Sequence, residues 1–142
     1  MNKYQELRNR QQKEIDAFPF MWAFNKKQFA EGMEKLGLKE TDTDKIYSIG
    51  GGGFIRKTDS EALKEMLDRQ TDEMEKAIAD DPTGDGFIYD MFDYELANHE
   101  YGYTGDITDT IDCLGLTAEQ IEADARLSHG LKRAIRHQRK RS

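Results

Sequence analysis

Four consecutive glycines, Gly50 to Gly53, constrain the fold of this chain more than any other feature of its sequence. They are flanked by two short runs that contain β-branched and aromatic residues, Lys45 to Ile49 (KIYSI) and Phe54 to Lys57 (FIRK). Such runs joined by a glycine turn are typical of a β-hairpin, because glycine adopts the positive φ angles that tight turns require. We therefore predict a small antiparallel sheet around residues 45–57.

The rest of the sequence has mainly helical periodicity. Apolar residues recur three or four positions apart in 2–17, in a segment that a capping box at Thr58 opens and that runs to about Ala79, in 87–99, and in the C-terminal region that opens at Thr117. Each is therefore predicted to form a helix. The segment 20–24 (FMWAF) is predicted to be a buried strand or extended piece that adds to the hairpin. The predicted class is a predominantly helical α+β fold with a small antiparallel sheet.

Local signals predict where several helices begin and end. The similar sequences KLGL at 35–38 and CLGL at 113–116 are typical of glycine-terminated helices followed by a hydrophobic contact. Thr117 and Gln120 have the spacing of a capping box. Asp85, just before the helix that starts near Phe87, is predicted to cap it. The alternative is a calcium-binding EF-hand loop from Asp81, but its last position, where a glutamate is required, is Phe92.

Composition favours a folded, water-soluble protein. Of the 142 residues, 37% are hydrophobic and 35% are charged, which argues against disorder and against a membrane span. The single cysteine, Cys113, excludes an internal disulfide. We expect a cytoplasmic protein with one compact domain at 1–131 and a basic helical tail at 132–142.

The charges are distributed unevenly along the chain. The formal net charge is −7, yet residues 126–142 contain seven Lys and Arg and no acid, while no Lys or Arg occurs between Ala77 and Ala125. An acidic surface of this kind repels nucleic acid and favours basic partner proteins. The alternative is that the basic tail folds back on the acidic part and neutralises it.

Glu95 and His99 are the candidate catalytic residues. They lie four positions apart on the apolar side of the helix predicted at 87–99, so their side chains could hydrogen-bond and act as an acid/base pair, with Asp106 nearby. The alternative is a buried pair whose role is structural. No metal site is predicted, since no HExxH motif or other complete ligand set accompanies them. No cofactor is predicted either, because Phe54 follows the four glycines where a phosphate-binding loop would have Lys.

A second set of acids is the candidate partner-binding surface. These residues follow one side of the 87–99 helix and continue into the next segment, where they could imitate a row of phosphates: Asp90, Asp93, Glu100, Asp106, Asp109 and Asp112. The alternative is an ordinary solvated face. Direct contact with nucleic acid is expected only through the basic stretch at 132–141 (KRAIRHQRKR), which lacks the aromatic residues that single-strand or membrane binding uses.

Three stretches, at 18–38, 45–63 and 84–106, resemble a family of small uncharacterised proteins encoded in Firmicutes genomes, often in phage-like or plasmid-like contexts. The family has no assigned activity, so the resemblance carries over no catalytic residue. It implies a mobile-element setting, in which small acidic proteins often inhibit host defence proteins.

These observations lead to three hypotheses of function. The first is a non-enzymatic interaction protein of a mobile element, of the anti-CRISPR or anti-restriction type, which binds a basic nucleic-acid-processing host protein through its acidic surface. The second is a small hydrolase or metal-dependent enzyme that uses Glu95 and His99. The third is a nucleic-acid-associated protein that makes contact through its basic C-terminal helix.

Overall fold

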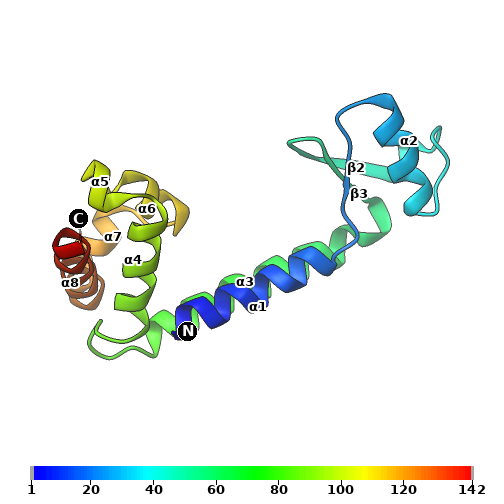
Figure 1. Cartoon of the computed structure of the whole chain (residues 1–142). Coiled ribbons are helices and arrows are strands. Elements are labelled where there is room, and N and C mark those ends of the chain that lie inside the picture. The colour runs from blue at the N-terminus through cyan, green and yellow to red at the C-terminus, as the bar shows by residue number, and fades with distance from the viewer. Residues whose placement is uncertain (1, 142) are drawn as a thin grey trace. The chain divides into compact units, whose positions relative to one another are not determined.

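The computed structural model describes residues 2–141 (Figure 1). Its elements, in chain order, are α1 (Lys3–Ala17), β1 (Met21–Trp22), α2 (Lys26–Lys35), the 3-10 turn η1 (Thr43–Lys45), β2 (Ile46–Gly50), β3 (Gly53–Arg56), η2 (Lys57–Asp59), α3 (Ser60–Ala79), α4 (Phe87–Asn98), α5 (Tyr101–Thr104), α6 (Thr108–Cys113), α7 (Ala118–Ala123) and α8 (Ala125–Arg141). The predicted class, predominantly helical α+β with a small antiparallel sheet, is confirmed.

Internal contacts group these elements into two compact units. Unit 1 comprises Met1–Gln11 and Asp72–Ser142, and unit 2 comprises Gln12–Thr71. Helices α1 and α3 therefore contribute residues to both units. No helix in the described range 2–141 is long and apolar enough to cross a membrane.

Unit 2 contains the three-stranded antiparallel sheet, in the order β1-β3-β2. The hairpin predicted from the glycines is formed by β2 and β3, with Tyr47 opposite Ile55, and β1 pairs Met21 with Phe54 on the other side of β3. Helix α2 packs on the face of the sheet that carries Met21, where Met33 is completely buried. The prediction that 20–24 adds to the hairpin is confirmed.

The same segment differs from the prediction in its burial. Met21 is buried, but Trp22 is 55% exposed and Phe24 is 74% exposed. Successive side chains of a strand point to opposite faces, and α2 covers only the face that Met21 occupies. The expectation of a fully buried apolar strand was therefore wrong for Trp22 and Phe24.

The glycines of the hairpin meet two requirements. Gly50, Gly51 and Gly52 adopt φ angles of +87°, +60° and +82°, in the region that disfavours residues with a Cβ atom. A Cβ atom on Gly52 would lie 2.5 Å from the ring of Phe24, and one on Gly53 would lie 2.6 Å from the ring of Trp22. The glycines thus allow both the turn and the close approach of these two aromatic rings.

The local termination signals are also confirmed. Leu38 N donates to Met33 O at 2.9 Å, and Leu116 N donates to Ile111 O at 3.1 Å, which closes α2 and α6 with the same 6→1 hydrogen bond of a Schellman motif. The capping box of Thr117 and Gln120 forms at the start of α7.

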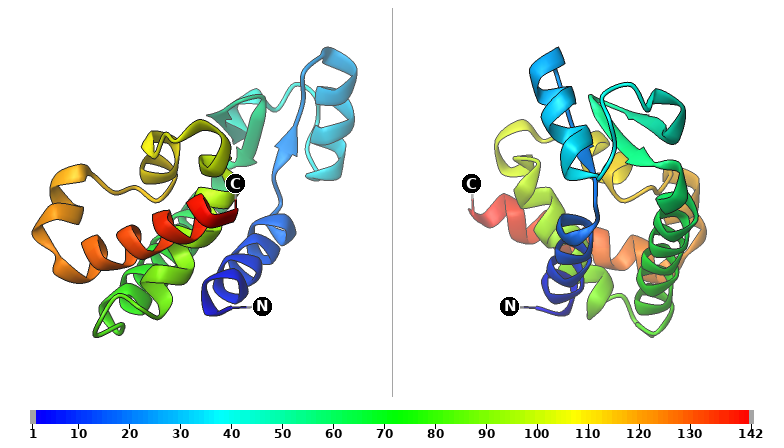
Figure 2. Two further views of the ribbon diagram at one scale, coloured as in Figure 1. Left: turned by 60° about the vertical axis from the view of Figure 1, so that its left-hand side comes forward. Right: turned by 90° about the vertical axis from the view of Figure 1, so that its right-hand side faces the viewer.

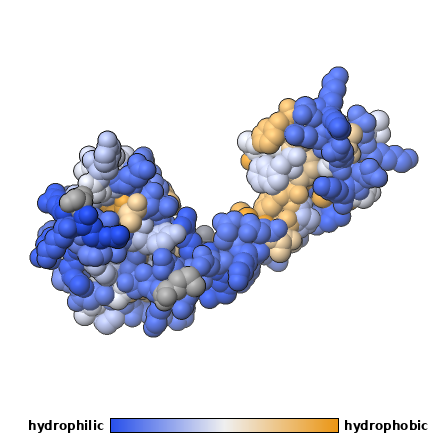
Figure 3. All heavy atoms as spheres, viewed as in Figure 1, coloured by the Kyte–Doolittle hydropathy of each residue, from blue (hydrophilic) through white to orange (hydrophobic). Residues whose placement is uncertain are grey.

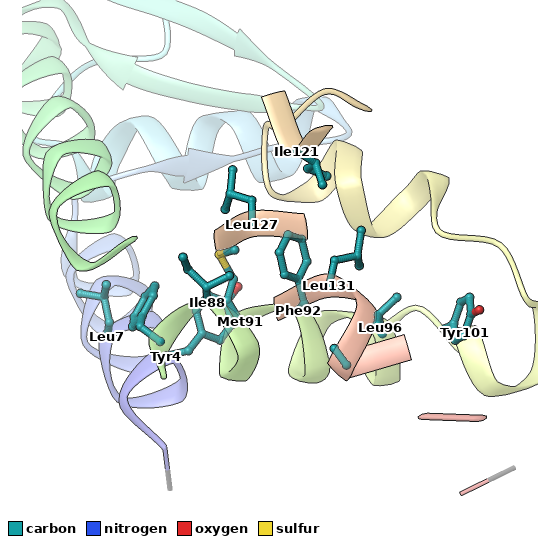
Figure 4. Packing of buried hydrophobic residues seen from close by; sticks show 12 residues of the cluster. Tyr4, Leu7, Ile88, Met91, Phe92, Leu96, Tyr101, Ile121, Leu127 and Leu131 are labelled. Atoms are coloured by element: carbon teal, nitrogen blue, oxygen red, sulfur yellow. The ribbon is translucent and has the colours of Figure 1, made fainter. Parts of the chain in front are cut away.

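Unit 1 is built around α4, which lies beside α8 (Figures 1 and 2). Apolar side chains from α1, α4, α5, α7 and α8 form its core, including Phe92, Leu96 and Leu131 (Figure 4). Helices α4 and α8 approach closely at Gly130, where a Cβ atom would lie 2.6 Å from Ile88 and 2.7 Å from the carbonyl oxygen of Gly84. Helix α8 runs without a break through residue 131, where we expected the domain to end, and Gln138 beyond that point is buried.

Candidate functional site

The segment before α4 is organised by the buried carboxylate of Asp81. Its Oδ1 accepts hydrogen bonds from the backbone N–H groups of Thr83 and Gly84 at 3.1 and 2.9 Å, and its Oδ2 accepts from those of Gly86 and Ile88 at 3.1 and 3.0 Å. Burial by itself would raise the pKa of Asp81, but the four N–H donors lower it below the usual range for aspartate. Asp81 therefore satisfies the free N–H groups at the start of α4.

The predicted cap, Asp85, has another role. Its side chain is half exposed and contacts helix α8, with Arg133 Nη1 and His129 Nε2 both 2.7 Å from Oδ1. Arg133 and then His129 lower the pKa of Asp85. The expectation that Asp85 caps α4 was wrong, because the carboxylate of Asp81 accepts hydrogen bonds from the N–H groups at the start of this helix instead.

Arg126 closes the other side of this turn. Its Nη1 donates to the backbone carbonyl oxygens of Ile78, Ala79 and Asp81 at 3.1, 3.2 and 2.7 Å, and its Nη2 donates to Asp124 at 2.9 Å. The C-terminal end of α3 and the start of α8 are thus tied by one guanidinium group, which binds carbonyls that the helix itself leaves free.

Basic residues of α8 also pair with the middle of α4. His137 Nδ1 lies 2.6 Å from Asp93 Oδ1, and Gln138 Nε2 donates to the same oxygen at 2.9 Å. The C-terminal helix therefore folds back onto acids of α4, as the alternative reading of the charge pattern predicted. As a result, Asp93 is engaged within unit 1.

Asp90, another predicted member of the acidic surface, is partly buried. Burial, followed by the charges of Asp93 and Asp81, raises its pKa. Its partial burial makes this carboxyl group less accessible to a partner than the exposed acids that follow it.

The remaining predicted acids, Glu100, Asp106, Asp109 and Asp112, are exposed. Asp106 Oδ1 accepts from Thr108 N at 2.9 Å, so its side chain is fixed at the start of α6. None of these four acids forms an ion pair within the described part of the chain. The structure thus divides the predicted acidic surface into an engaged part on α4 and an open part on α5 and α6.

Two further acids, Glu119 and Glu122, were not among the predicted site residues. Both are exposed on α7, which follows α6 in unit 1. The signal that could have identified them is the absence of Lys and Arg from the sequence between Ala77 and Ala125. We call the six acids of 100–123 the α5–α7 acids: Glu100, Asp106, Asp109, Asp112, Glu119 and Glu122.

The candidate catalytic residue Glu95 is 1% exposed and occupies a polar cluster in the core. The hydroxyl group of Tyr4 donates to its Oε2 at 2.5 Å, Arg8 Nε lies 3.7 Å from the same oxygen, and Cys113 Sγ lies 3.7 Å from it. Asn98 contacts the other carboxylate oxygen. Burial, reinforced by the hydrogen bond and charge of Glu95, raises the pKa of Tyr4, and burial and Glu95 also raise the pKa of Cys113.

His99 does not join this cluster through its ring. Its Nδ1 lies 2.8 Å from the backbone carbonyl oxygen of Glu95, one turn back along α4. The predicted side-chain pair is therefore replaced by two separate contacts, and Glu95 serves to attach α1 to α4. Among residues 2–141, no group of three or more His, Cys, Asp or Glu side chains is arranged to hold a metal ion.

A model of a family of unknown function, DUF7659, matches residues 3–137. The chain belongs to this family. The match spans residues of both units of this DUF7659 protein, including Glu95 and the α5–α7 acids. The comparisons with curated proteins and with solved structures gave no match.

Proposed function

We propose that this DUF7659 protein is a non-enzymatic interaction protein that binds a basic, nucleic-acid-processing partner through the α5–α7 acids. One observation carries the proposal. Helix α8 engages Asp85, just before α4, and Asp93 on α4, whereas Glu100, Asp106, Asp109 and Asp112 remain exposed and without an ion pair in the described chain. Four exposed acids without an ion pair therefore follow one another within residues 100–112 of unit 1.

The spacing of these acids supports binding to a surface that normally contacts phosphates. Asp109 and Asp112 are three residues apart on α6, and Asp106 lies just before the start of this helix. Positions three apart on a helix have neighbouring side chains, about 5–6 Å apart at Cβ. Carboxylates repeated at this interval offer a row of negative charges to Lys and Arg side chains, and such complementarity mainly accelerates and orients association.

The finer form of the proposal is an inhibitor of the anti-CRISPR or anti-restriction type, carried by a mobile element. An acidic surface that competes with nucleic acid for a basic groove would suit such a protein. The resemblance to proteins from phage-like and plasmid-like contexts supports the setting, while the choice of target rests on electrostatics alone.

The test compares two variants with the same change in charge. In the first, called the α5–α7 variant, four of the six α5–α7 acids become amides: Glu100→Gln, Asp106→Asn, Asp109→Asn and Asp112→Asn. The control makes the same change at four exposed acids of α3: Glu61→Gln, Glu65→Gln, Asp72→Asn and Glu75→Gln. Asn at position 106 keeps an oxygen that can accept from Thr108 N, so the start of α6 is retained.

Each tagged protein is used to capture partners from a nuclease-treated bacterial lysate, with bound proteins identified and quantified by mass spectrometry. We expect the wild type and the α3 control to retain a stoichiometric basic protein that dissociates as salt is raised, and the α5–α7 variant to lose it. Equal retention by both variants, or equal loss from both, would contradict the proposal, because binding would then not depend on where the charges lie.

A further inference from the structure

A basic groove in unit 1 lies outside the α5–α7 acids. It encloses about 350 Å³ and is lined by Tyr89 of α4 and by Arg133, Arg136, His137 and Lys140 of α8. The four α8 residues are spaced three, four and seven positions from the first, which places them along one side of the helix. The groove therefore combines a row of basic groups with one aromatic hydroxyl group.

Two of the basic groups are held in place by the protein. The guanidinium group of Arg133 lies 4.4 Å from the centre of the Tyr89 ring and bonds Asp85 at 2.7 Å. His137 is fixed through Nδ1 by Asp93, which leaves Nε2 as the nitrogen that can meet a ligand. Side chains that are already ordered lose less conformational entropy when a ligand binds.

The other two basic groups supply charge that no acid balances. Arg136 and Lys140 are exposed, and neither forms an ion pair within residues 2–141. The charged residues that line the groove are all basic, and Asp85 and Asp93 beside it are each already engaged by α8. Charge of this sign, next to several N–H donors, favours an anion with several acceptor oxygens.

We propose that this groove binds a phosphate group. Arg136 and Lys140 provide the charge, the free N–H groups of Arg133 and the hydroxyl group of Tyr89 donate hydrogen bonds, and protonated His137 donates from Nε2. The phosphate group comes either from a free phosphate-bearing molecule or from a nucleic-acid backbone, since both present the same tetrahedral oxygens. This site is independent of the proposed function, because it uses none of the α5–α7 acids.

The experiment follows amide and side-chain signals of the isotope-labelled full-length protein by NMR. Inorganic phosphate and a single-stranded ten-nucleotide DNA are titrated separately, with ionic strength held constant by sodium chloride. We expect saturable shifts at Tyr89 and at residues 133–140 with both probes. Tighter binding of the DNA per phosphate group identifies the backbone as the source, and equal or weaker binding identifies a free phosphate-bearing molecule.

Variants separate a built site from general charge attraction. Arg136→Ala and Lys140→Ala are each expected to weaken phosphate binding about tenfold, since each variant removes a charged hydrogen-bond donor. Lys132→Ala removes the same charge from an exposed position of α8 that does not line the groove, and should have little effect. Tyr89→Phe keeps the ring beneath Arg133 and should weaken binding by a smaller factor.

The proposal is overturned if neither probe shifts Tyr89 and residues 133–140, or if Lys132→Ala weakens binding as much as Arg136→Ala. It is also overturned if shifts from phosphate persist unchanged in both groove variants. The α5–α7 amide variant should bind phosphate as the wild type does, so failure of the partner-capture experiment leaves this test intact.

Discussion

The two units of the chain differ in how much apolar surface they bury. Among the described residues, the core cluster of unit 1 contains 12 buried hydrophobic side chains, whereas that of unit 2 is built around Met21, Met33 and Leu36. Large apolar side chains that stay exposed are mostly in unit 2: Trp22, Phe24, Tyr47, Ile49 and Leu67. Figure 3 shows the same contrast, with apolar atoms at the surface over the strands of unit 2 and a mainly hydrophilic visible face on unit 1.

The comparison shows that the units depend on different kinds of interaction. Unit 1 combines a larger core with polar contacts between residues far apart in the sequence, such as Tyr4 with Glu95. Unit 2 has a smaller core and relies more on features set by neighbouring residues, such as its hairpin and the Schellman motif at Gly37. The following predictions test this difference, beginning with the largest expected effect.

Truncation of one core residue in each unit should destabilise mainly the unit that contains it. Phe92→Ala should destabilise unit 1 by about 4 kcal/mol and Met33→Ala should destabilise unit 2 by about 3 kcal/mol, because each leaves a cavity in a fully buried position. Hydrogen exchange, measured amide by amide, reports the two units separately. Met33→Ala should accelerate exchange mainly in Gln12–Thr71, and equal acceleration in both units would contradict the division into two cores.

Substitution of the two aspartates before α4 should have unequal effects. Asp81→Asn should cost about 2 kcal/mol, because an amide cannot accept from the N–H groups on both sides of the carboxylate. Asp85→Asn should cost clearly less than Asp81→Asn, since its ion pairs with α8 are half exposed to solvent. Urea denaturation of both variants measures the loss in free energy of unfolding. Similar losses would show that the hydrogen bonds of Asp81 stabilise the protein no more than the ion pairs of Asp85.

The stabilisation that Asp81 provides should depend on pH, which the variant Asp81→Asn can show. Because the pKa of Asp81 is lowered in the folded protein, its contribution to stability is present above the unfolded pKa, near 4, and is lost as the pH falls through the folded pKa. The stability difference between wild type and Asp81→Asn should therefore narrow below about pH 4. A difference that stays constant down to pH 2 would show that the carboxylate charge is not what stabilises the turn.

Removal of one hydroxyl group should test the polar cluster in the core of unit 1. Tyr4→Phe should cost about 1.5 kcal/mol, because buried Glu95 loses a charged hydrogen bond. The matched control is Tyr101→Phe, which changes another buried tyrosine of the same core and should be close to neutral. Thermal unfolding of the two variants checks this, and equal costs would indicate that the hydroxyl contact with Glu95 contributes little.

Of the two residues of β1, the larger one, Trp22, should contribute less to stability than its neighbour Met21. Trp22→Ala should change stability by less than about 1 kcal/mol, because the ring is 55% exposed, while Met21→Ala should cost 2 kcal/mol or more at a buried position, roughly the usual range for core truncation. Chemical denaturation followed by far-UV circular dichroism measures both. A larger loss for Trp22→Ala would mean that the exposed aromatic face stabilises unit 2 itself.

Features that arise within a few residues were predictable from the sequence. The hairpin, the two Schellman motifs and the capping box at Thr117 each depend on residues at most ten positions apart, so the local pattern contains the whole interaction. The prediction for 20–24 was only half right, since the alternation of faces could not show that α2 covers one side of the sheet and leaves Trp22 uncovered.

For the candidate site, too, the sequence indicated some features and not others. The absence of basic residues from 77–125 indicated an acidic surface, and the exposed positions of Glu100, Asp106, Asp109 and Asp112 agree with it. The pairing of Asp93 with His137 could not be read from the sequence, because the two residues are 44 positions apart and meet only when α8 packs on α4. The contact of Glu95 with Tyr4, 91 positions away, was hidden for the same reason.

The sequence by itself therefore determined the helices, the hairpin, their ends and the overall charge distribution, because these follow from local backbone preference and from composition. Only the tertiary structure decided which charges remain open to a partner. Asp81 and Asp85 are chemically identical and four residues apart, yet one is buried among four N–H donors and the other pairs with α8. Burial and partner geometry, which arise when distant segments pack together, set the role of each carboxylate.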